Sequence, residues 1–256
     1  MARYYEEYPA YVSAEERRRR AQGEAEKRTR KGATLAPIAI TGRKIATTFW
    51  GGAWCDHLEG HSDYESRLPR GRTYVRSGAV LDLQIAKGRV TALVHGSAPY
   101  EVSVAIAPLA ERRWAGIVQT CGGKIESLVE LLQGKLSRAV MEVVTDRDAG
   151  LFPAPEEIKL DCSCPDHALM CKHVAAALYG VGARLDASPD LLFLLRGVDH
   201  LALIEGAGRG RPSGAPGEAQ THTHAHKRIA RADLADVFGI DLEVEPPPKT
   251  RQRSRR

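Results

Sequence analysis

The run IKLDCSCPDHALMCKHVAAALYGVG, residues 158–182, decides how this chain folds. Its centre holds three cysteines and a histidine within twelve residues, in the spacing Cys-x-Cys, six residues, Cys-x-His. Thiolate sulfur and imidazole nitrogen are ligands that zinc prefers, and four protein ligands complete its tetrahedron and leave no position for water or substrate. The spacing therefore predicts a structural zinc site held by Cys162, Cys164, Cys171 and His173.

The residues around this cluster predict a strand before it and a helix after it. From Ile158 to Cys164 every second residue is apolar or a cysteine, so both thiols should lie on one face of a strand. Downstream, four residues have the spacing of one apolar helix face: Val174, Ala177, Leu178 and Val181. We expect this helix to end near Gly180 and Gly182. Because positions i and i+2 do not share a helix face, Cys171 should precede the first turn and His173 should enter it.

Other interpretations of the cysteines were weighed against zinc. A disulfide between Cys162 and Cys164 would close a small, strained ring. Five cysteines in a chain that begins MARYYEEYPA, without an apolar secretory segment, do not fit oxidising export. A redox dithiol or another metal is the alternative to zinc, and His167 is the alternative to His173 as the fourth ligand.

The ligand pattern, with a strand before it and a helix after it, resembles the SWIM zinc finger. The stretch CSCPDHALMCKHVAAALYGVGARLD matches that module closely. Three further stretches are similar to bacterial SWIM zinc finger family proteins, so the resemblance covers roughly residues 45–206: FWGGAWCDHLE, DYESRLPRGRTYVRSGAV and GLFPAPEEIKLDCSCPD.

The resemblance implies a zinc-binding module with Zn²⁺ on Cys162, Cys164, Cys171 and His173. It also implies a partner, because SWIM fingers bind DNA or protein and the stand-alone bacterial members resemble companions of helicase-type ATPases. This chain has no G-x-x-x-x-G-K-[ST] phosphate loop, so we expect any motor activity to come from a partner.

Length and charge set limits on the class of protein. With 256 residues the chain can bury one good-sized core or two small ones. No apolar run approaches the ~18 residues of a membrane span, so we expect a cytoplasmic protein with no membrane association. Residues 1–44 carry 11 Lys+Arg and 6 Asp+Glu, residues 207–256 carry 10 and 6, and residues 45–206 are net negative. Basic ends are typical of arms that reach anionic partners, or simply of solvated ends.

We predict an α+β fold in four parts. Residues 1–44 form a charged N-terminal arm, partly disordered; 45–150 an α+β body; 151–206 the SWIM finger and following helices; and 207–256 a low-complexity basic tail with one short helix. Both basic termini are expected to be flexible.

Within the body, a short helix over Phe49–Leu58 precedes an antiparallel β-meander over residues 73–107. Its three strands show apolar residues at alternate positions and are joined at turns rich in glycine: Leu81 to Ile85, Val90 to Val94, and Tyr100 to Ile106. Helices over 114–121 and 136–143 should cover its apolar face. After the finger, Ser188 and Pro189 predict the start of a helix that Gly197 ends.

Four arginines at the entry to the meander are candidate phosphate ligands: Arg67, Arg70, Arg72 and Arg76. The alternative is a solvated loop whose arginines pair with nearby carboxylates, namely Asp56, Glu59, Asp63 or Glu65. Trp50 and Trp54 would stack on bases in a single-strand binder, but we interpret them as core residues.

Two further groups contain metal-ligand types without a complete site. Cys55, His57 and His61 lack a fourth ligand nearby. The histidines of the tail have nothing to hold their geometry: His222, His224 and His226. The glycine-rich run GAGRGRPSG follows no strand, so a dinucleotide site is not indicated.

The sequence thus predicts a non-enzymatic interaction module that binds zinc and, through it, DNA or a helicase-type ATPase, with no small-molecule substrate. The alternative is a hydrolase using Cys55 with a histidine, or a metal-dependent nuclease, although no H-E-x-x-H, G-x-S-x-G or paired acidic metal motif is present. We expect Cys171→Ala to release zinc and loosen residues 162–184 while the meander stays folded.

Overall fold

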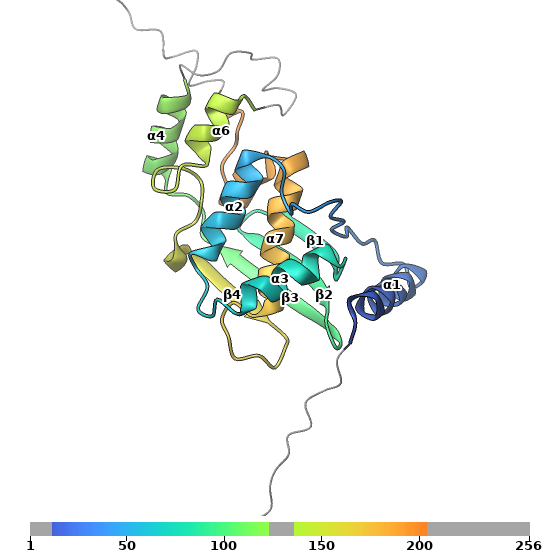
Figure 1. Ribbon diagram of the computed structural model, residues 1–256. Coiled ribbons are helices and arrows are strands. Elements are labelled where there is room, and N and C mark those ends of the chain that lie inside the picture. Colours follow the sequence, from blue (N-terminus) through green and yellow to red (C-terminus); the bar gives the residue numbers. More distant parts are fainter. Residues whose placement is uncertain (1–11, 123–135, 204–256) are drawn as a thin grey trace, which may run out of the picture. The chain divides into compact units, whose positions relative to one another are not determined.

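A four-stranded antiparallel sheet in the order β1-β2-β3-β4 forms one layer of the protein (Figure 1). The computed structural model describes residues 12–122 and 136–203. The strands are β1 (Val80–Ala86), β2 (Arg89–His95), β3 (Pro99–Ile106) and β4 (Ile158–Cys162). The first three are the predicted meander. The strand of the finger adds to its edge, pairing with β3 from Val102↔Cys162 to Ile106↔Ile158. The α+β prediction is confirmed, and the metal-binding segment is part of the same sheet.

An irregularity in β1 changes the face on which one predicted core residue lies. The register between β1 and β2 shifts between Val80 and Asp82. Leu81 consequently packs with Leu93 and with Ala21 of α1 (Ala14–Arg30), whereas Leu83 joins the main core. The prediction that Leu81 shares a face with Leu83 is wrong, because a bulge reverses the alternation of side chains at that point.

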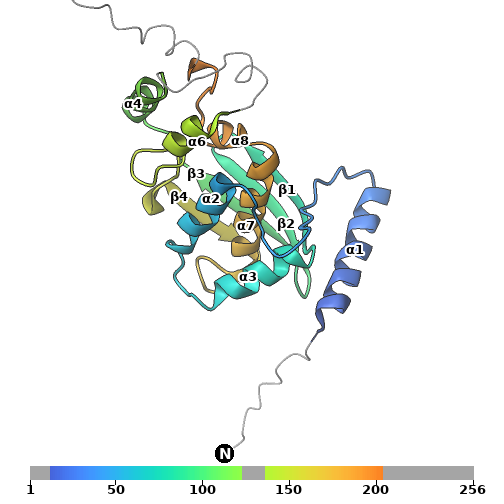
Figure 2. The ribbon, with the colours of Figure 1, turned by 45° about the horizontal axis from the view of Figure 1, so that its top comes forward.

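The apolar face of the sheet is covered by α7 (Lys172–Ala187), the helix of the finger, which contacts all four strands. Two further helices, α2 (Phe49–Glu59) and α3 (Arg67–Arg76), pack on α7 (Figures 1 and 2). The prediction that the helices after the meander cover the sheet is wrong. Instead, α4 (Glu111–Cys121) and α6 (Arg138–Val144) pack against each other. Helix α7 carries small and apolar residues on nearly all sides, so it can lie between the sheet and the two outer helices with all these residues buried.

Helix α7 does not end at its glycines but continues through them to Ala187. A Cβ on Gly182 would lie 2.6 Å from Cys55 Sγ and 3.1 Å from the carbonyl oxygen of Gly51 in α2. A Cβ on Gly71 of α3 would likewise lie 2.5 Å from the Cβ of Ala175. Gly182 therefore allows α2 to approach α7 closely, and Gly71 does the same for α3. Gly182 is needed for this packing and does not act as the predicted end of α7.

The remaining described elements flank this core. Helix α1 lies beside β1 and β2 (Figure 2). A short 3₁₀ helix, η1 (Pro155–Glu157), precedes β4, and α8 (Leu191–Arg196) ends at Gly197, whose φ is 73°. Arg196 is fully buried and donates to both carboxylate oxygens of Glu157, at 2.8 and 2.9 Å, so α8 is tied to the start of β4.

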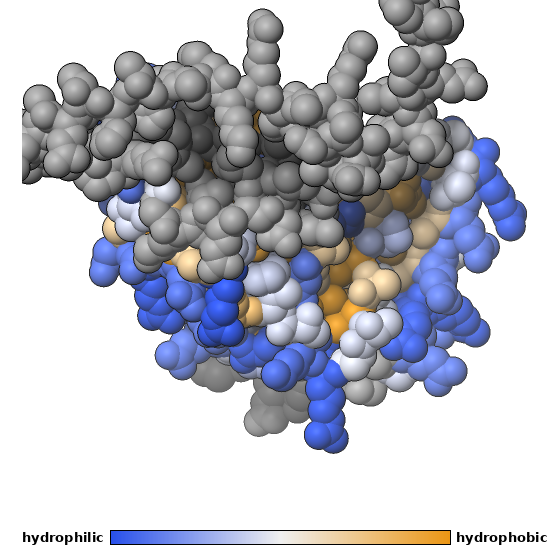
Figure 3. Space-filling view, turned by 90° about the horizontal axis from the view of Figure 1, so that it is seen from above, coloured by the Kyte–Doolittle hydropathy of each residue, from blue (hydrophilic) through white to orange (hydrophobic). Residues whose placement is uncertain are grey.

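Several sequence predictions fall outside the described residues: the tail helix, the tail histidines and the glycine-rich run. The boundaries at residues 44, 150 and 206 stay predictions. Seen from above, the part of the described surface not covered by grey atoms shows an apolar area bordered by hydrophilic residues below it and to its right (Figure 3). Among the described residues, no helix combines the length and apolar character needed to span a bilayer.

Candidate metal centre

Three segments bring the predicted ligands together. Strand β4 ends at Cys162, Cys164 follows two residues later, and Cys171 is the N-cap of α7, with His173 in its first turn. Their ligand atoms all lie within 4.8 Å of one another. Among the described residues, these four form the one group that could hold a metal ion. Cys171 therefore precedes the helix and His173 enters it, as the spacing predicted.

The distances within the cluster suit zinc. His173 Nδ1 lies 3.9 Å from Cys162 Sγ and 3.9 Å from Cys171 Sγ. A tetrahedral zinc with its usual bonds to sulfur and nitrogen separates neighbouring ligand atoms by roughly 3.5–3.8 Å. Neither Cys162, Cys164 nor Cys171 forms a disulfide, and His167 is exposed and outside the cluster. The donors present, three sulfurs and one imidazole nitrogen, are those of a closed structural site.

The thiols influence one another strongly. A hydrogen bond from the Cys162 thiol lowers the pKa of Cys171, and His173 and the Val174 N–H at the start of α7 act in the same direction. The same hydrogen bond, followed by burial, raises the pKa of Cys162, and burial raises the pKa of Cys164. A bound divalent cation supplies the charge that holds all three as thiolates. It is the short distances between these three sulfurs and the imidazole nitrogen that suit the cluster to a cation.

Aromatic rings hold His173 in place. Its ring centroid lies 4.4 Å from that of Tyr100 and 5.4 Å from that of Tyr74. On β2's side, a Cβ on Gly96 would lie 2.7 Å from His173 Nε2. His173 is 1% exposed, and its Nε2 has no hydrogen-bond partner among the described residues. The ring is therefore oriented by packing, which turns Nδ1 toward the cysteines, and not by a hydrogen bond at Nε2.

The loop between the ligand pairs is held by hydrogen bonds to Asp63, in the connection between α2 and α3, and to Arg67, the first residue of α3. The Asp63 carboxylate accepts hydrogen bonds from the backbone N–H groups of Leu169, at 2.8 Å, and Met170, at 3.0 Å. Arg67 donates to Asp166 at 3.0 Å. From the sequence, Asp63 is a candidate partner of the nearby arginines. Its bonds to the finger loop could not be predicted, because it lies over a hundred residues from the groups it binds.

The four arginines proposed as phosphate ligands lie on helix α3. This helix was not predicted, and it occupies the residues from 73 to 76 that were expected to begin the meander. Arg67 pairs with Asp166, Arg72 pairs with Glu59 and donates to the Tyr179 hydroxyl at 2.7 Å, and Arg76 donates to the Arg43 carbonyl oxygen at 2.9 Å. Arg70 is exposed. The expectation of carboxylate partners holds for Arg72 and Glu59, and the nucleic-acid role of the four stays a prediction.

The residues weighed as a second site are used differently. Cys55 is buried, and burial raises its pKa to about 12. His57 Nε2 lies 2.8 Å from the carbonyl oxygen of Pro153. Trp54 is fully buried and donates to the carbonyl oxygen of Leu178, so it is a core residue as predicted. Trp50 is partly buried, packs against the core and donates to the carbonyl oxygen of Leu185.

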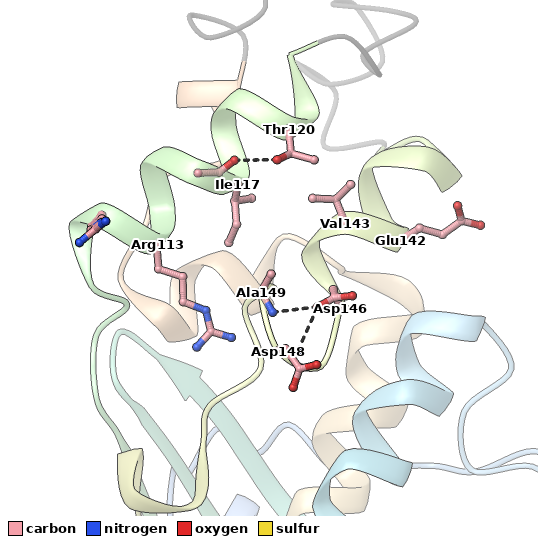
Figure 4. A pocket seen from close by; sticks show the side chains of 10 residues that line it. Arg113, Ile117, Thr120, Glu142, Val143, Asp146, Asp148 and Ala149 are labelled. Atoms are coloured by element: carbon pink, nitrogen blue, oxygen red, sulfur yellow. Dashed lines mark hydrogen bonds between the residues drawn. The ribbon is translucent and has the colours of Figure 1, made fainter.

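A cavity of about 550 Å³ lies between α4 and α6, apart from the cysteines (Figure 4). Ile117 and Val143 line it together with Asp146. The Asp146 carboxylate is turned to its own turn, where it accepts from the N–H groups of Asp148, at 3.0 Å, and Ala149, at 2.8 Å. This carboxylate therefore serves to fix the backbone.

A sheet edge joined to a central helix by a cluster of three cysteines and a histidine defines a zinc finger with a structural metal site. A family model described as SWIM zinc finger matches residues 148–181. The chain belongs to the SWIM zinc finger family and binds zinc. It is 34% identical over 214 residues to "Uncharacterized protein Rv2102" from Mycobacterium tuberculosis, covering 80% of this chain and 76% of that protein. No solved structure matches.

Proposed function

We propose that this protein is a non-enzymatic interaction module whose zinc site fixes a docking surface for a protein partner, of the helicase-type ATPase class that the family resemblance implies. One observation carries the proposal: the four ligands join the edge strand β4 to α7, the helix that contacts every strand. Zinc therefore positions the sheet edge relative to the core. A closed site of four ligands offers no position for a substrate, and the buried Cys55 thiol, with its raised pKa, is a poor nucleophile.

The charges of the described residues favour a protein partner over DNA. In α1, Arg20 and Arg28 pair with Glu16 and Glu24 four residues earlier. In α3, Arg67 and Arg72 pair with carboxylates from other segments. Guanidinium groups already paired in this way are less available to neutralise phosphates. DNA binding is the second outcome that the experiments below would reveal.

The test of the proposal is copurification from the native cell. The tagged full chain, His173→Ala and His167→Ala would be compared at equal expression, with the bound proteins identified by mass spectrometry. We expect a helicase-type ATPase with the native chain and with His167→Ala, whose imidazole is exposed and outside the cluster. We expect its loss with His173→Ala, which removes a zinc ligand. Equal recovery with all three proteins would contradict the proposal.

A filter-binding titration over salt, with duplex and single-stranded DNA, addresses the second outcome. A protein-docking module should bind both weakly and should lose the binding steeply as salt rises, as expected for contacts of flexible basic arms. Binding that persists at physiological salt and falls with Arg70→Ala, the exposed arginine of α3, would instead assign DNA recognition to the folded body.

A further inference from the structure

Strand β4 has an outer edge that no described strand pairs with. On its inner side, Ser163 N–H donates to Glu101 O at 3.0 Å and Ala107 N–H donates to Glu157 O at 2.9 Å. Hydrogen-bonding groups alternate in direction along an antiparallel strand. Residues of β4 with odd numbers thus face β3, and the N–H and C=O of Leu160 point outward.

A cavity of about 410 Å³ lies at this edge. Three consecutive residues of β4, Ile158 to Leu160, line it, although their side chains alternate between the two faces of the sheet. The cavity must therefore reach the edge itself. Four apolar side chains from the end of α2, the finger loop and α7 also line it: Leu58, Leu169, Met170 and Leu178. The rest of the lining is Pro155, His61 and Asp63. Leu169 is 71% exposed, the largest exposure of any large apolar side chain that was found in the described residues.

We propose that this groove binds an extended peptide segment of the protein partner, which adds to β4 as a fifth strand. The peptide backbone would pair with the outward N–H and C=O of Leu160, and its alternate apolar side chains would fill the cavity. Lys159 lines the groove and forms no ion pair within the described residues. An acidic residue of the peptide opposite Lys159 would supply the missing charge.

This inference rests on the proposed function and names its docking surface. The zinc cluster and Asp63 set both walls of the groove. Cys162 ends β4, and Cys171 follows directly after Leu169 and Met170, whose N–H groups are held by Asp63. Metal binding therefore fixes the width of the groove, and peptide binding should require zinc.

The test uses random dodecapeptides displayed on phage and selected on the zinc-loaded full chain. Selected peptides should alternate apolar residues and carry an acidic residue. The best peptide, measured by fluorescence anisotropy, should lose at least about tenfold in affinity with Leu169→Glu. The matched control is Leu194→Glu on α8, 42% exposed and outside the groove lining, which should bind as the native chain does. Amide exchange at Leu160 should slow on binding.

Other results would overturn the assignment of the groove. These are selection of no alternating peptide, unchanged exchange at Leu160 in the complex, or unchanged affinity with Leu169→Glu. A free chain that sediments as a dimer with a slowly exchanging Leu160 amide would place a second copy at the edge instead. If the copurified ATPase binds Leu169→Glu as tightly as the native chain, the groove assignment fails and the proposed function stands. If no ATPase is recovered with the native chain, the proposed function itself fails.

Discussion

At the residue scale, Gly96 leaves no room for a side chain beside the metal ligand His173. The turn at Gly96 brings the backbone against the imidazole of His173, on the side away from the cysteines. A methyl group there would lie 2.7 Å from Nε2 and 2.9 Å from the ring of Tyr100, both closer than van der Waals contact allows. Neither ring has much freedom. The His173 ring is buried against Tyr74 and Tyr100, and the Tyr100 hydroxyl shares a hydrogen bond with Ser97 Oγ at 2.7 Å. The metal site therefore requires a glycine at residue 96, because any side chain there would displace the His173 ring.

We therefore expect Gly96→Ala to weaken zinc binding by about tenfold or more, the usual effect of disturbing groups that orient metal ligands. Competition with a chromogenic chelator measures the affinity. The control is Gly116→Ala on α4, where the new Cβ would meet no atom within 4 Å. An affinity for Gly96→Ala equal to that of the control would show that His173 is not held by this contact.

At the scale of elements, α2 is attached to α7 by hydrogen bonds to one carboxylate and by a close contact between glycines beside it. The Asp186 carboxylate of α7 accepts hydrogen bonds from the backbone and hydroxyl groups of Thr47 and Thr48, and Thr48 is the N-cap of α2. Burial raises the pKa of Asp186, but these hydrogen bonds outweigh it and hold the pKa below its ordinary value. The charged form is therefore favoured by folding.

The sign of the pH dependence follows from this shift. A carboxyl whose pKa is lowered by folding contributes stability above its unfolded pKa, about 4, and loses it as the pH falls through the folded value. We expect Asp186→Asn to lower the free energy of unfolding by ~1–3 kcal/mol at neutral pH. The difference between the native chain and the variant should shrink below about pH 4. Urea unfolding across this range measures it, and a constant difference would contradict the assignment.

Beside this carboxylate, the contact between the two helices depends on paired glycines. Gly182 of α7 faces Cys55 and the backbone of Gly51, so Gly182→Ala should push α2 away from α7. We expect a loss of ~1–3 kcal/mol in unfolding free energy, the typical cost of overpacking a core. Thermal unfolding compares it with Gly116→Ala, which should be neutral or slightly stabilising. Equal melting temperatures would mean that the two helices can separate without cost.

These elements show where sequence reasoning succeeds and where it stops. Spacing alone predicted the ligand set and the strands, because both depend on residues close together in the chain. The extent of α7 was misjudged because Gly182 looks locally like a helix end, whereas its role depends on Gly51, far away in sequence. The same holds for Asp63, which binds the finger loop. Contacts of this kind leave no periodic signal in a single sequence.

At the scale of the whole molecule, the position of α7 changes what zinc removal should do. The ligand spacing alone predicts that loss of the metal loosens residues 162–184 and leaves the meander folded. However, α7 contacts all four strands and carries α2 and α3 on its other side. Structural zinc supplies roughly 10–16 kcal/mol in finger peptides at neutral pH, comparable to the entire stability of a domain. A helix released from the metal would leave the apolar face of the sheet uncovered.

We therefore expect chelation of zinc to destabilise the sheet together with the finger. Hydrogen exchange measured by mass spectrometry should quicken in β2 and β3 after chelation, and the protection should return when zinc is added back. The control is the same chelator added already saturated with zinc, which should leave exchange in β2 and β3 unchanged. If β2 and β3 kept native protection without zinc while residues 162–184 lost it, packing of α7 would not depend on the metal, and the finger would be a local clip on an independently stable sheet.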